Sequence, residues 1–293
     1  MGSEPDAVTG RGTLAVAVLS HTRPAQVARL VSRLESGSNT VVAVHHDPRG
    51  EPLQLRPSSS VALVPDPVSC PWGRLGIVAA IRKSLGWLRA NVPTLSWALV
   101  ISGLDYPIRT MASIESELAA ARCDAFLRHF RLDCDPADDV HPWQATARRR
   151  YLYRRRLPAS ARSLSLPWPR RNPFRGNVGL YAGDVWVNLS ARAVHKVLDS
   201  PLNDPMLRYL RHSPNPDEAW GVSVALNGEP DLVVMNDRRR YIRWPPRSRH
   251  PAALVPADLP NLRASNAFFA RKVDLAAWPE AYDALDALAA DRD

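Results

Sequence analysis

The sequence has little cysteine, and none of its apolar runs is long enough to cross a membrane. Cys70, Cys123 and Cys134 are an odd number at unrelated spacings, which fits neither a disulfide framework nor a zinc site. We interpret them as ordinary free thiols. No run approaches the roughly 18 to 20 consecutive apolar residues of a membrane-spanning helix. The start lacks the basic and apolar regions of a secretory signal, so we expect a disordered leader over 1–12 and a cytoplasmic protein.

Several motifs of nucleotide, metal and hydrolytic enzymes are also missing. The chain has no P-loop and no Gly-x-Gly-x-x-Gly after its first apolar run, and it has no nucleophile elbow. A metal-binding motif is suggested only by Asp133, Asp135, Asp138 and Asp139. These acids lie in a polar, Pro-containing stretch without the small, apolar strand context that such a motif needs. We therefore expect no metal and no other cofactor.

Lysine is rare, whereas arginine and proline are abundant. Of the 38 basic residues only Lys83, Lys196 and Lys272 are lysines, and the chain has 27 prolines and a net charge of +9. An excess of positive charge is compatible with nucleic-acid binding. It also suits an enzyme whose substrate carries a pyrophosphate, because positive clefts concentrate anions. The charge does not decide between these classes, but the apolar share of 45% predicts a globular protein.

Apolar runs and helical patterns alternate along the chain. Continuous apolar runs predict buried strands at 13–20, 40–47, 60–64, 97–103 and 124–130. Apolar residues at helical spacing, with start signals such as Pro24, predict helices at about 24–34, 74–91, 112–121, 191–198, 217–227 and from 275 onward. Strands that alternate with helices indicate βαβ units and a mostly parallel central sheet. We expect one α/β domain over 13–293.

The stretch 131–176 interrupts this alternation. It is rich in Arg, Pro and Trp, contains the arginine runs 148–150 and 154–156, and has no clear periodicity. A long irregular insertion in a compact domain is usually functional or mobile. A solvated run of charge is an equally good interpretation.

The segment 214–220 (PNPDEAW) is the first that could carry chemistry. Pro216 before Asp217 and Glu218 predicts a helix start with two carboxylates in the first turn, where the helix dipole favours their charged forms. Glu218 could face a cleft as a general base. The alternative is simply a favourable helix N-terminus.

Two further segments place polar groups where a ligand could bind. In 268–274 (FFARKVD), two aromatic residues could anchor the chain while Arg271 and Lys272 project outward, and paired cations suit phosphate oxygens. The alternative is a solvated basic turn, and Arg249 lies in a comparable, equally ambiguous loop. Asp105 closely follows the strand predicted at 97–103, where ligands of open α/β sheets bind; an ordinary turn explains it equally well.

The order of these segments resembles the core-2/I-branching family, which comprises β-1,6-N-acetylglucosaminyltransferases and their peptide O-xylosyltransferase relatives. The matching segments are VLSHTRPAQVARLVSRL (18–34), VAVHHD (42–47), CPWGRLGIVAAIRKSL (70–85), WALVISGLDYPIRT (97–110), YAGDVWVNLSARAV (181–194), PNPDEAW (214–220), RYIRW (240–244), and HPAALVPADL with FFARKVD (250–274). The resemblance covers most of the chain apart from about 131–175.

This resemblance implies a GT-A-like (Rossmann-type) fold and an inverting glycosyltransferase that uses a UDP-sugar without a divalent metal ion. The family's catalytic base falls on Glu218. Its diphosphate-binding lysine falls on Lys272, with Arg271 as a helper. Its arginine, counted back through Asp258, falls on Arg249, although a gap could shift it. GlcNAc is the expected sugar, transferred to an acceptor hydroxyl with a β-linkage.

The resemblance also assigns the remaining candidate site positions. Nucleotide contacts are expected from Ser20, His21 and Asp47, and donor or acceptor sugar contacts from Asp105, Trp186, Asp217 and Trp244. The chain would divide into a nucleotide-binding half (13–130), an acceptor-side insertion (131–176) and a catalytic half (177–293). Unlike the family pattern, Pro48 intervenes between Asp47 and the basic residue Arg49.

Alternatives to this interpretation remain at the level of sequence. UDP-xylose or UDP-glucose could be the donor, with a peptide or a secondary metabolite as the acceptor. Animal members carry disulfides and a membrane anchor that this chain does not have, so we expect a bacterial member. The expected partners are the donor and a small-molecule, glycan or peptide acceptor, without nucleic acid. The alternative from another class is an arginine-rich nucleic-acid-binding protein, which would bind DNA or RNA with steep salt dependence.

Overall fold

The computed structural model describes residues 12–133, 142–156, 164–170, 178–245, 248 and 250–292. The predicted leader therefore lies outside the described residues except for its last position. Cys70 and Cys123 are free thiols, as predicted, and Cys134 lies outside the described residues. In the described part of the chain, no helix has the length and apolar character needed to span a bilayer.

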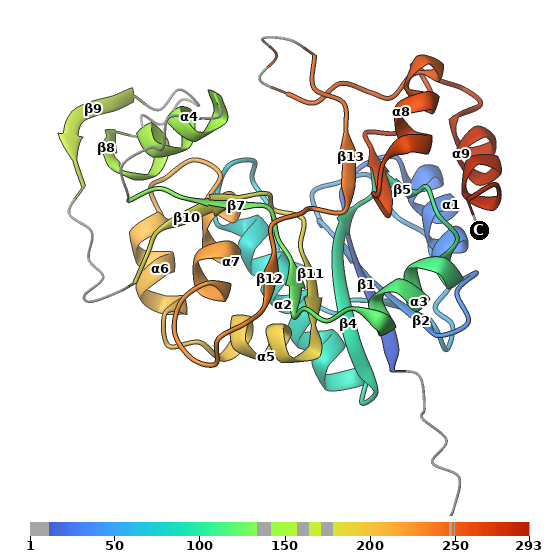
Figure 1. Ribbon diagram of the computed structural model, residues 1–293, viewed down its shortest axis with the longest axis horizontal. Helices are drawn as coiled ribbons and strands as arrows, with labels where there is room; N and C mark the ends of the chain where they lie inside the picture. Colours follow the sequence, from blue (N-terminus) through green and yellow to red (C-terminus); the bar gives the residue numbers. More distant parts are fainter. Residues whose placement is uncertain are drawn as a thin grey trace, which may run out of the picture.

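A seven-stranded sheet forms the centre of the molecule (Figure 1). Its order is β12-β6-β11-β4-β1-β2-β3. The bounds are β1 (Thr13–Ser20), β2 (Thr40–His46), β3 (Val61–Leu63), β4 (Leu95–Ser102), β6 (Ala125–Phe126), β11 (Asn188–Ser190) and β12 (Val234–Met235). Strands β4, β1, β2 and β3 are parallel neighbours, whereas β11 is antiparallel to both β4 and β6. The predicted mostly parallel α/β sheet is confirmed.

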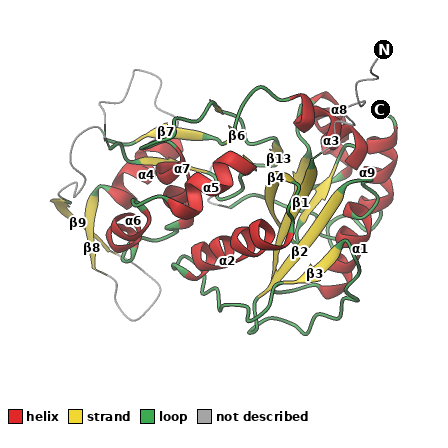
Figure 2. Ribbon diagram, turned by 90° about the horizontal axis from the view of Figure 1, so that it is seen from below, coloured by secondary structure: helices red, strands yellow, loops and turns green. Residues whose placement is uncertain are grey.

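Helices cover both faces of this sheet (Figure 2). In β1, Ala15 and Ala17 belong to the apolar cluster under α2, whereas Val16 and Val18 belong to the cluster under α1 and α9. Burial on both faces explains why β1 is a continuous apolar run rather than an alternating one. The helices are α1 (Pro24–Leu34), α2 (Gly76–Asn91), α3 (Met111–Ala120), α5 (Ala191–Asp199), α6 (Asn203–Leu210), α7 (Asp217–Ala225), α8 (Leu259–Ala264) and α9 (Ala281–Ala290).

A second, three-stranded sheet lies beside the central one and brings distant segments together. Strand β14 (Phe269–Arg271) pairs parallel with β13 (Arg240–Ile242) and antiparallel with β5 (Asp105–Pro107), which follows β4 closely. Its register places Arg271 opposite Asp105. The segment FFARKVD is therefore a buried strand at its start, with Phe268 and Phe269 in the core, rather than a solvated turn.

The structure corrects two of the predicted elements. The strand predicted at 124–130 is broken into β6 and β7 (His129–Arg131), because β6 pairs in the central sheet whereas β7 pairs with β10 (Tyr181–Gly183). The last helix begins at Ala281 rather than at 275, since residues 275–280, which include Pro279, form turns.

The described parts of 131–176 are more regular than predicted. They form α4 (Pro142–Tyr151) and the antiparallel pair β8 (Tyr153–Arg156) and β9 (Leu164–Pro169). Helix α4 packs onto the core through Ala147 and Tyr151, which are both buried, and Trp143 contacts the same cluster. These three residues have i, i+4 spacing, but the arginines between them hide the pattern.

Candidate active site

The ends of β1 and β2 form the first part of the candidate site. The Ser20 hydroxyl lies 2.9 Å from His46 Nδ1, and His46 Nε2 lies 2.6 Å from the Glu51 carbonyl oxygen. Because a carbonyl only accepts, His46 Nε2 carries the proton and Nδ1 accepts from Ser20. His21 is exposed, and a Cβ at Gly50 would lie 2.0 Å from its carbonyl oxygen, so only glycine permits this close approach.

Asp47 is buried at the end of β2 and organises the loop that follows. Its carboxylate accepts from Arg49 Nη2 at 2.7 Å, from the Arg49 backbone N–H at 2.9 Å and from the Cys70 N–H at 2.9 Å. Burial alone would raise the pKa of Asp47, but the bonds from Arg49 and Cys70 hold that pKa well below its usual range. Thus Arg49 reaches Asp47 although Pro48 intervenes.

Asp105 lies beneath the site rather than at its surface. Its side chain is inaccessible to solvent, and Oδ2 accepts from the Ser102 N–H at 2.7 Å and the Ser102 hydroxyl at 2.5 Å. Oδ1 lies 2.9 Å from Arg240 Nε and 4.0 Å from Arg271 Nε. Asp105 is therefore a buried counter-ion for two guanidinium groups, and the predicted direct sugar contact is not possible in this arrangement.

Trp186 provides a surface on which the same two guanidinium groups pack. The Arg271 guanidinium carbon lies 4.5 Å from the centroid of the Trp186 rings, and that of Arg240 lies 5.8 Å away. Trp186 itself is buried, with 8% of its surface exposed. Stacking and the ion pair with Asp105 together fix the direction of the two arginines.

Lys272 extends this positive region beyond the end of β14. Burial, Arg271 and Arg23 all lower the pKa of Lys272, as expected for a cation among cations. Arg23 pairs with Asp274 at 2.8 Å. The Lys272 ammonium group has no hydrogen-bond or ion-pair partner among the residues that the structure describes, whereas its backbone carbonyl accepts from the Leu254 N–H at 2.9 Å. The nearby acids are Asp105, Asp184 and Asp274, so the four cations Arg23, Arg240, Arg271 and Lys272 still leave an excess of positive charge, which suits an anion.

Glu218 lies in the first turn of α7 and is held from three directions. Its Oε1 accepts from Asn215 Nδ2 at 2.9 Å, its Oε2 accepts from Arg150 Nη1, and the Tyr151 hydroxyl lies 3.5 Å from Oε2. The side chain retains 22% exposure. Burial raises the pKa of Glu218, while Arg150, Asn215 and Tyr151 act in the opposite direction. A partly exposed carboxylate with a raised pKa is suited to general-base chemistry.

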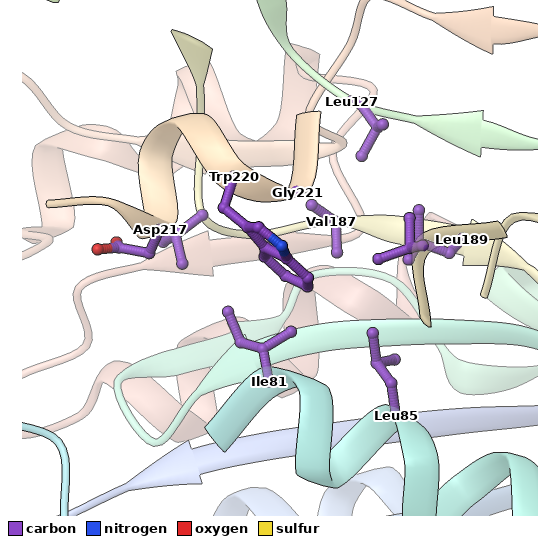
Figure 3. A pocket seen from close by; sticks show the side chains of 10 residues that line it. Ile81, Leu85, Leu127, Val187, Leu189, Asp217, Trp220 and Gly221 are labelled. Carbon is purple, nitrogen blue, oxygen red and sulfur yellow. The ribbon is translucent and has the colours of Figure 1, made fainter. Parts of the chain in front are cut away.

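Asp217 precedes Glu218 but borders a different environment. Burial, together with the neighbouring charge of Glu218, raises the pKa of Asp217 to about 7. The void next to it has a volume of about 10 Å³ and is otherwise apolar, and Figure 3 shows the Asp217 carboxylate pointing away from the side chains of Ile81 and Trp220. Such a void holds at most one water molecule, so it is not a ligand site.

Asp184 joins the Glu218 region to the cationic region. Burial raises the pKa of Asp184 to about 6, and its carboxylate interacts electrostatically with Arg128, Arg240, Glu218 and Arg271. Glu218 and Arg271 therefore lie within electrostatic reach of one carboxylate.

Other predicted positions are less informative. Trp244 follows β13 and is 48% exposed, and Arg249 lies outside the described residues. Asp133 pairs with Arg131 at 2.8 Å, whereas Asp135, Asp138 and Asp139 also lie outside. Within the described ranges, no group of three His, Cys, Asp or Glu side chains could hold a metal ion.

Several residues of the site escaped the sequence analysis. Arg150 was considered only as part of the arginine run 148–150, whereas in the structure Arg150 and its neighbour Tyr151 on α4 both contact Glu218. Arg240 belongs to the run 238–240, where alternation along β13 would have turned it inward. Arg23 was read only as part of a helix start, although it directly follows the end of β1. Asn215 gave no signal of its own.

Comparison with known families gives one match. A family model with the description "Branch: Core-2/I-Branching enzyme" matches residues 37–263. A search of curated proteins finds no match. The matched range contains Asp47, Trp186 and Glu218, but it excludes Ser20 and Lys272. The assignment of the latter two therefore depends on the geometry and on the resemblance of short motifs.

Proposed function

This chain belongs to the Core-2/I-branching enzyme family of glycosyltransferases, with a GT-A-like fold, and we propose that it transfers a sugar from a UDP-sugar to an acceptor hydroxyl. The proposed reaction inverts the anomeric centre and needs no divalent metal ion. GlcNAc is the proposed sugar. The observation that carries the proposal is the partly exposed carboxylate of Glu218, which Arg150 and Asn215 hold at the start of α7.

The cation cluster is suited to stabilise the leaving group. Departure of UDP places negative charge on the β-phosphate, and preorganised charges at that position lower the barrier most. Lys272 is free to contact these oxygens, while Arg271 is held in place by Trp186 and Asp105. Each contact would contribute roughly 2–4 kcal/mol, by analogy with oxyanion donors. Arg249 is retained in the proposal as a further phosphate ligand.

Glu218 would remove the proton of the attacking hydroxyl. A base must be ionised before the reaction, and Arg150 and Asn215 stabilise the carboxylate of Glu218. Direct attack on an α-linked donor then gives a β-linkage in a single displacement. General-base assistance of this kind is typically worth about 10²- to 10⁴-fold in rate.

The other predicted positions take indirect roles in this proposal. Ser20 and His21 lie at the end of β1, where the nucleoside would bind. Asp47 shapes the loop through Arg49 and Cys70, since its oxygens are already occupied. Trp186 supports Arg271, and the exposed Trp244 offers an aromatic face to an acceptor sugar.

The arginines of the insertion favour an enzyme over a nucleic-acid-binding protein. Arg150 pairs with Glu218, and Arg170 donates to the Ser213 hydroxyl at 2.8 Å and stacks 3.8 Å over the Tyr209 ring. Arg148 donates to the Leu132 carbonyl oxygen. Among the arginines whose side chains the structure describes in the insertion, these three are used inside the fold, while Arg131 and Arg149 are exposed and Arg131 pairs with Asp133. The described arginines therefore do not form a free phosphate-binding face.

A thermal-shift panel of UDP-GlcNAc, UDP-xylose, UDP-glucose and UDP, each with and without EDTA, tests the donor class. A ligand that binds the folded state raises the melting temperature. We expect UDP-sugars to stabilise the protein equally in EDTA. If xylose or glucose donors give the larger shift, the sugar assignment changes. If no UDP-sugar stabilises the protein, the proposed function is wrong.

The role of Glu218 is tested with Glu218→Gln, with the exposed Glu280→Gln as the matched control. Release of UDP from the donor that binds best is the measurement. We expect Glu218→Gln to keep the thermal shift given by UDP but to lose at least about 100-fold in turnover. Near-normal turnover in Glu218→Gln would show that another group is the base.

A further inference from the structure

A second recess lies outside the cation cluster and the contacts of Glu218. This groove, called here the β7–α4 groove, has a volume of about 390 Å³ and is open to solvent. It lies among β7, α4 and the loop between β12 and β13. Its lining includes Arg128, His129, Phe130, Gln144, Asn236 and Arg238.

We propose that the β7–α4 groove binds an anionic group, a carboxylate or a phosphate, carried by the acceptor. The inference deepens the proposed glycosyl transfer and depends on it for the identity of the ligand as an acceptor. It names the chemical class of that acceptor, which neither the family nor the motifs supply.

The charges around the groove favour an anion. Arg128 has no hydrogen bond or ion pair with any residue that the structure describes. Arg238 pairs with Asp184 at 3.2 Å. Among the described residues that line the groove, the one carboxylate belongs to Asp237, which already accepts from the Arg239 N–H at 2.8 Å and from Asn266 Nδ2 at 3.0 Å. The groove thus presents guanidinium groups, the side chains best suited to bind carboxylate or phosphate.

The walls of the groove are fixed before any ligand binds. The Asn236 side chain accepts from the His129 N–H and donates to the His129 carbonyl oxygen, both at 2.9 Å, which ties the β12–β13 loop to β7. His129 Nδ1 lies 2.8 Å from the Leu127 carbonyl oxygen and therefore donates to it, leaving Nε2 as an acceptor in the neutral ring. A Cβ at Gly183 would lie 1.9 Å from the Arg128 carbonyl oxygen, so β10 holds the backbone of Arg128 closely. Such preorganisation lowers the entropic cost of binding.

The groove is connected to the base candidate through two features. Asp184 interacts electrostatically with both Arg128 and Glu218. Helix α4 supplies Gln144 to the groove and Arg150 to Glu218. Gln144 and Arg150 are six residues apart, about 9 Å of rise along the helix axis, so one short helix contributes to both the groove and the base candidate. The hydroxyl of an acceptor would then reach Glu218 while its anion lies beside Arg128.

Matched pairs of small probes test this proposal on the full chain with UDP bound. The carboxylate pair is methyl β-glucuronide and methyl β-glucoside, and the phosphate pair is glucose 6-phosphate and glucose. Calorimetric or NMR titration gives the dissociation constants. We expect at least one charged probe to bind tenfold more tightly than its neutral partner, and the pair that shows the difference identifies the anion. Equal binding within both pairs would overturn the proposal.

Variants assign the preference to the groove. In Arg128→Met we expect the charged probe to bind no more tightly than the neutral one, while Arg128→Lys keeps part of the preference. The control is Arg263→Met. Arg263 lies on α8 in an exposed ion pair with Asp291, and its variant should behave as wild type. An unchanged thermal shift with UDP shows that Arg128→Met is folded, and a preference that survives in that variant would contradict the assignment.

The same titrations separate this proposal from the proposed function. If the protein distinguishes the probes but binds no UDP, the anion-binding groove is supported and the proposed transferase function is contradicted. If the protein turns over a UDP-sugar but does not distinguish the probes, the proposed transferase function is supported and the anion-binding groove is contradicted.

Discussion

The environment of Glu218 combines two opposing influences on one carboxylate. Burial raises its pKa, and the guanidinium of Arg150 and the amide of Asn215 lower it. The guanidinium and the amide favour the carboxylate that must be present before the reaction, whereas burial favours acceptance of a proton from a hydroxyl. Arg150 is therefore a positioning residue whose loss should change the pH dependence of the reaction and not only its rate.

Arg150→Met tests this role. Without the guanidinium, the pKa of Glu218 rises, so a larger fraction of the base is protonated at low pH. We expect the acidic limb of the pH profile of kcat to move to higher pH, with activity best preserved on the alkaline side. Profiles between pH 5 and 9 measure the shift.

The matched control is Arg149→Met, because Arg149 is exposed in the same helix. The pH profile of Arg149→Met should follow that of wild type. The profile of Arg150→Lys should lie between those of wild type and Arg150→Met. If Arg150→Met lowers kcat equally at every pH, Arg150 contributes packing and not the charge that we assign to it.

Among the secondary-structure elements, the small sheet β5–β14–β13 sets the position of the side chains that we propose as phosphate ligands. Asp105 on β5 and Arg240 on β13 form an ion pair with no exposed surface, and Arg271 on β14 lies beside the same carboxylate. Removal of one partner of such a pair leaves an uncompensated buried charge, which typically costs about 3–5 kcal/mol.

We expect Asp105→Asn to lower the free energy of unfolding by an amount in this range, measured by urea denaturation. The double variant Asp105→Leu with Arg240→Met should recover part of the loss, because apolar residues can replace both members of a buried pair. Full recovery is not expected, since Arg271 also contacts Asp105. An Asp105→Asn protein as stable as wild type would mean that the pair does not hold the sheet together.

The extent of sequence-based prediction also differs from element to element. Strands β1, β2 and β4 were predicted correctly because their burial on both faces leaves an unmistakable apolar run. Helix α4 was missed because three core residues are separated by arginines and other polar residues. The break between β6 and β7 was missed because it depends on which strand each half pairs with, and pairing is a property of the fold.

The candidate site follows the same division. Glu218 and Lys272 were found because short motifs carry them. The partner of Glu218 was not found, because Arg150 is 68 positions away from it in sequence. The ion pair of Asp105 with Arg240 was not found either, because β5 and β13 come together only through β14. Asp105 and Trp186 were predicted to contact a sugar, whereas in the structure both side chains are buried and pack against Arg240 and Arg271.

For the whole molecule, buried carboxyl groups make stability depend on pH in a predictable direction. The pKa of Asp217 is raised to about 7 in the folded protein, well above the ordinary value for an aspartate of about 3.9. Between these values the carboxyl group of Asp217 keeps its proton in the folded state but has lost it in the unfolded state. The contribution of Asp217 to the free energy of unfolding is therefore fully present at low pH and is lost as the pH rises to 7.

Asp217→Asn removes this titration while keeping the shape of the side chain. As the pH rises from 5 to 8, we expect the melting temperature of Asp217→Asn to increase relative to that of wild type. The increase should be roughly 2–4 °C for each kcal/mol of stability that wild type loses through the titration of Asp217. Thermal unfolding at several pH values measures the difference. A constant offset between the two proteins would show that Asp217 is not protonated in the folded state at pH 5.

The central claim is that fixed side-chain cations, and no metal ion, hold the diphosphate of the donor. Calorimetric titration of UDP in EDTA tests it most directly, with wild type, Lys272→Met and the control Lys83→Met. Lys83 lies on α2 and donates to the Asp66 carbonyl oxygen. We predict that wild type and Lys83→Met bind UDP in EDTA with no gain from added Mn²⁺, and that Lys272→Met loses at least tenfold in affinity. Binding that requires Mn²⁺, or that is unchanged in Lys272→Met, would contradict the claim.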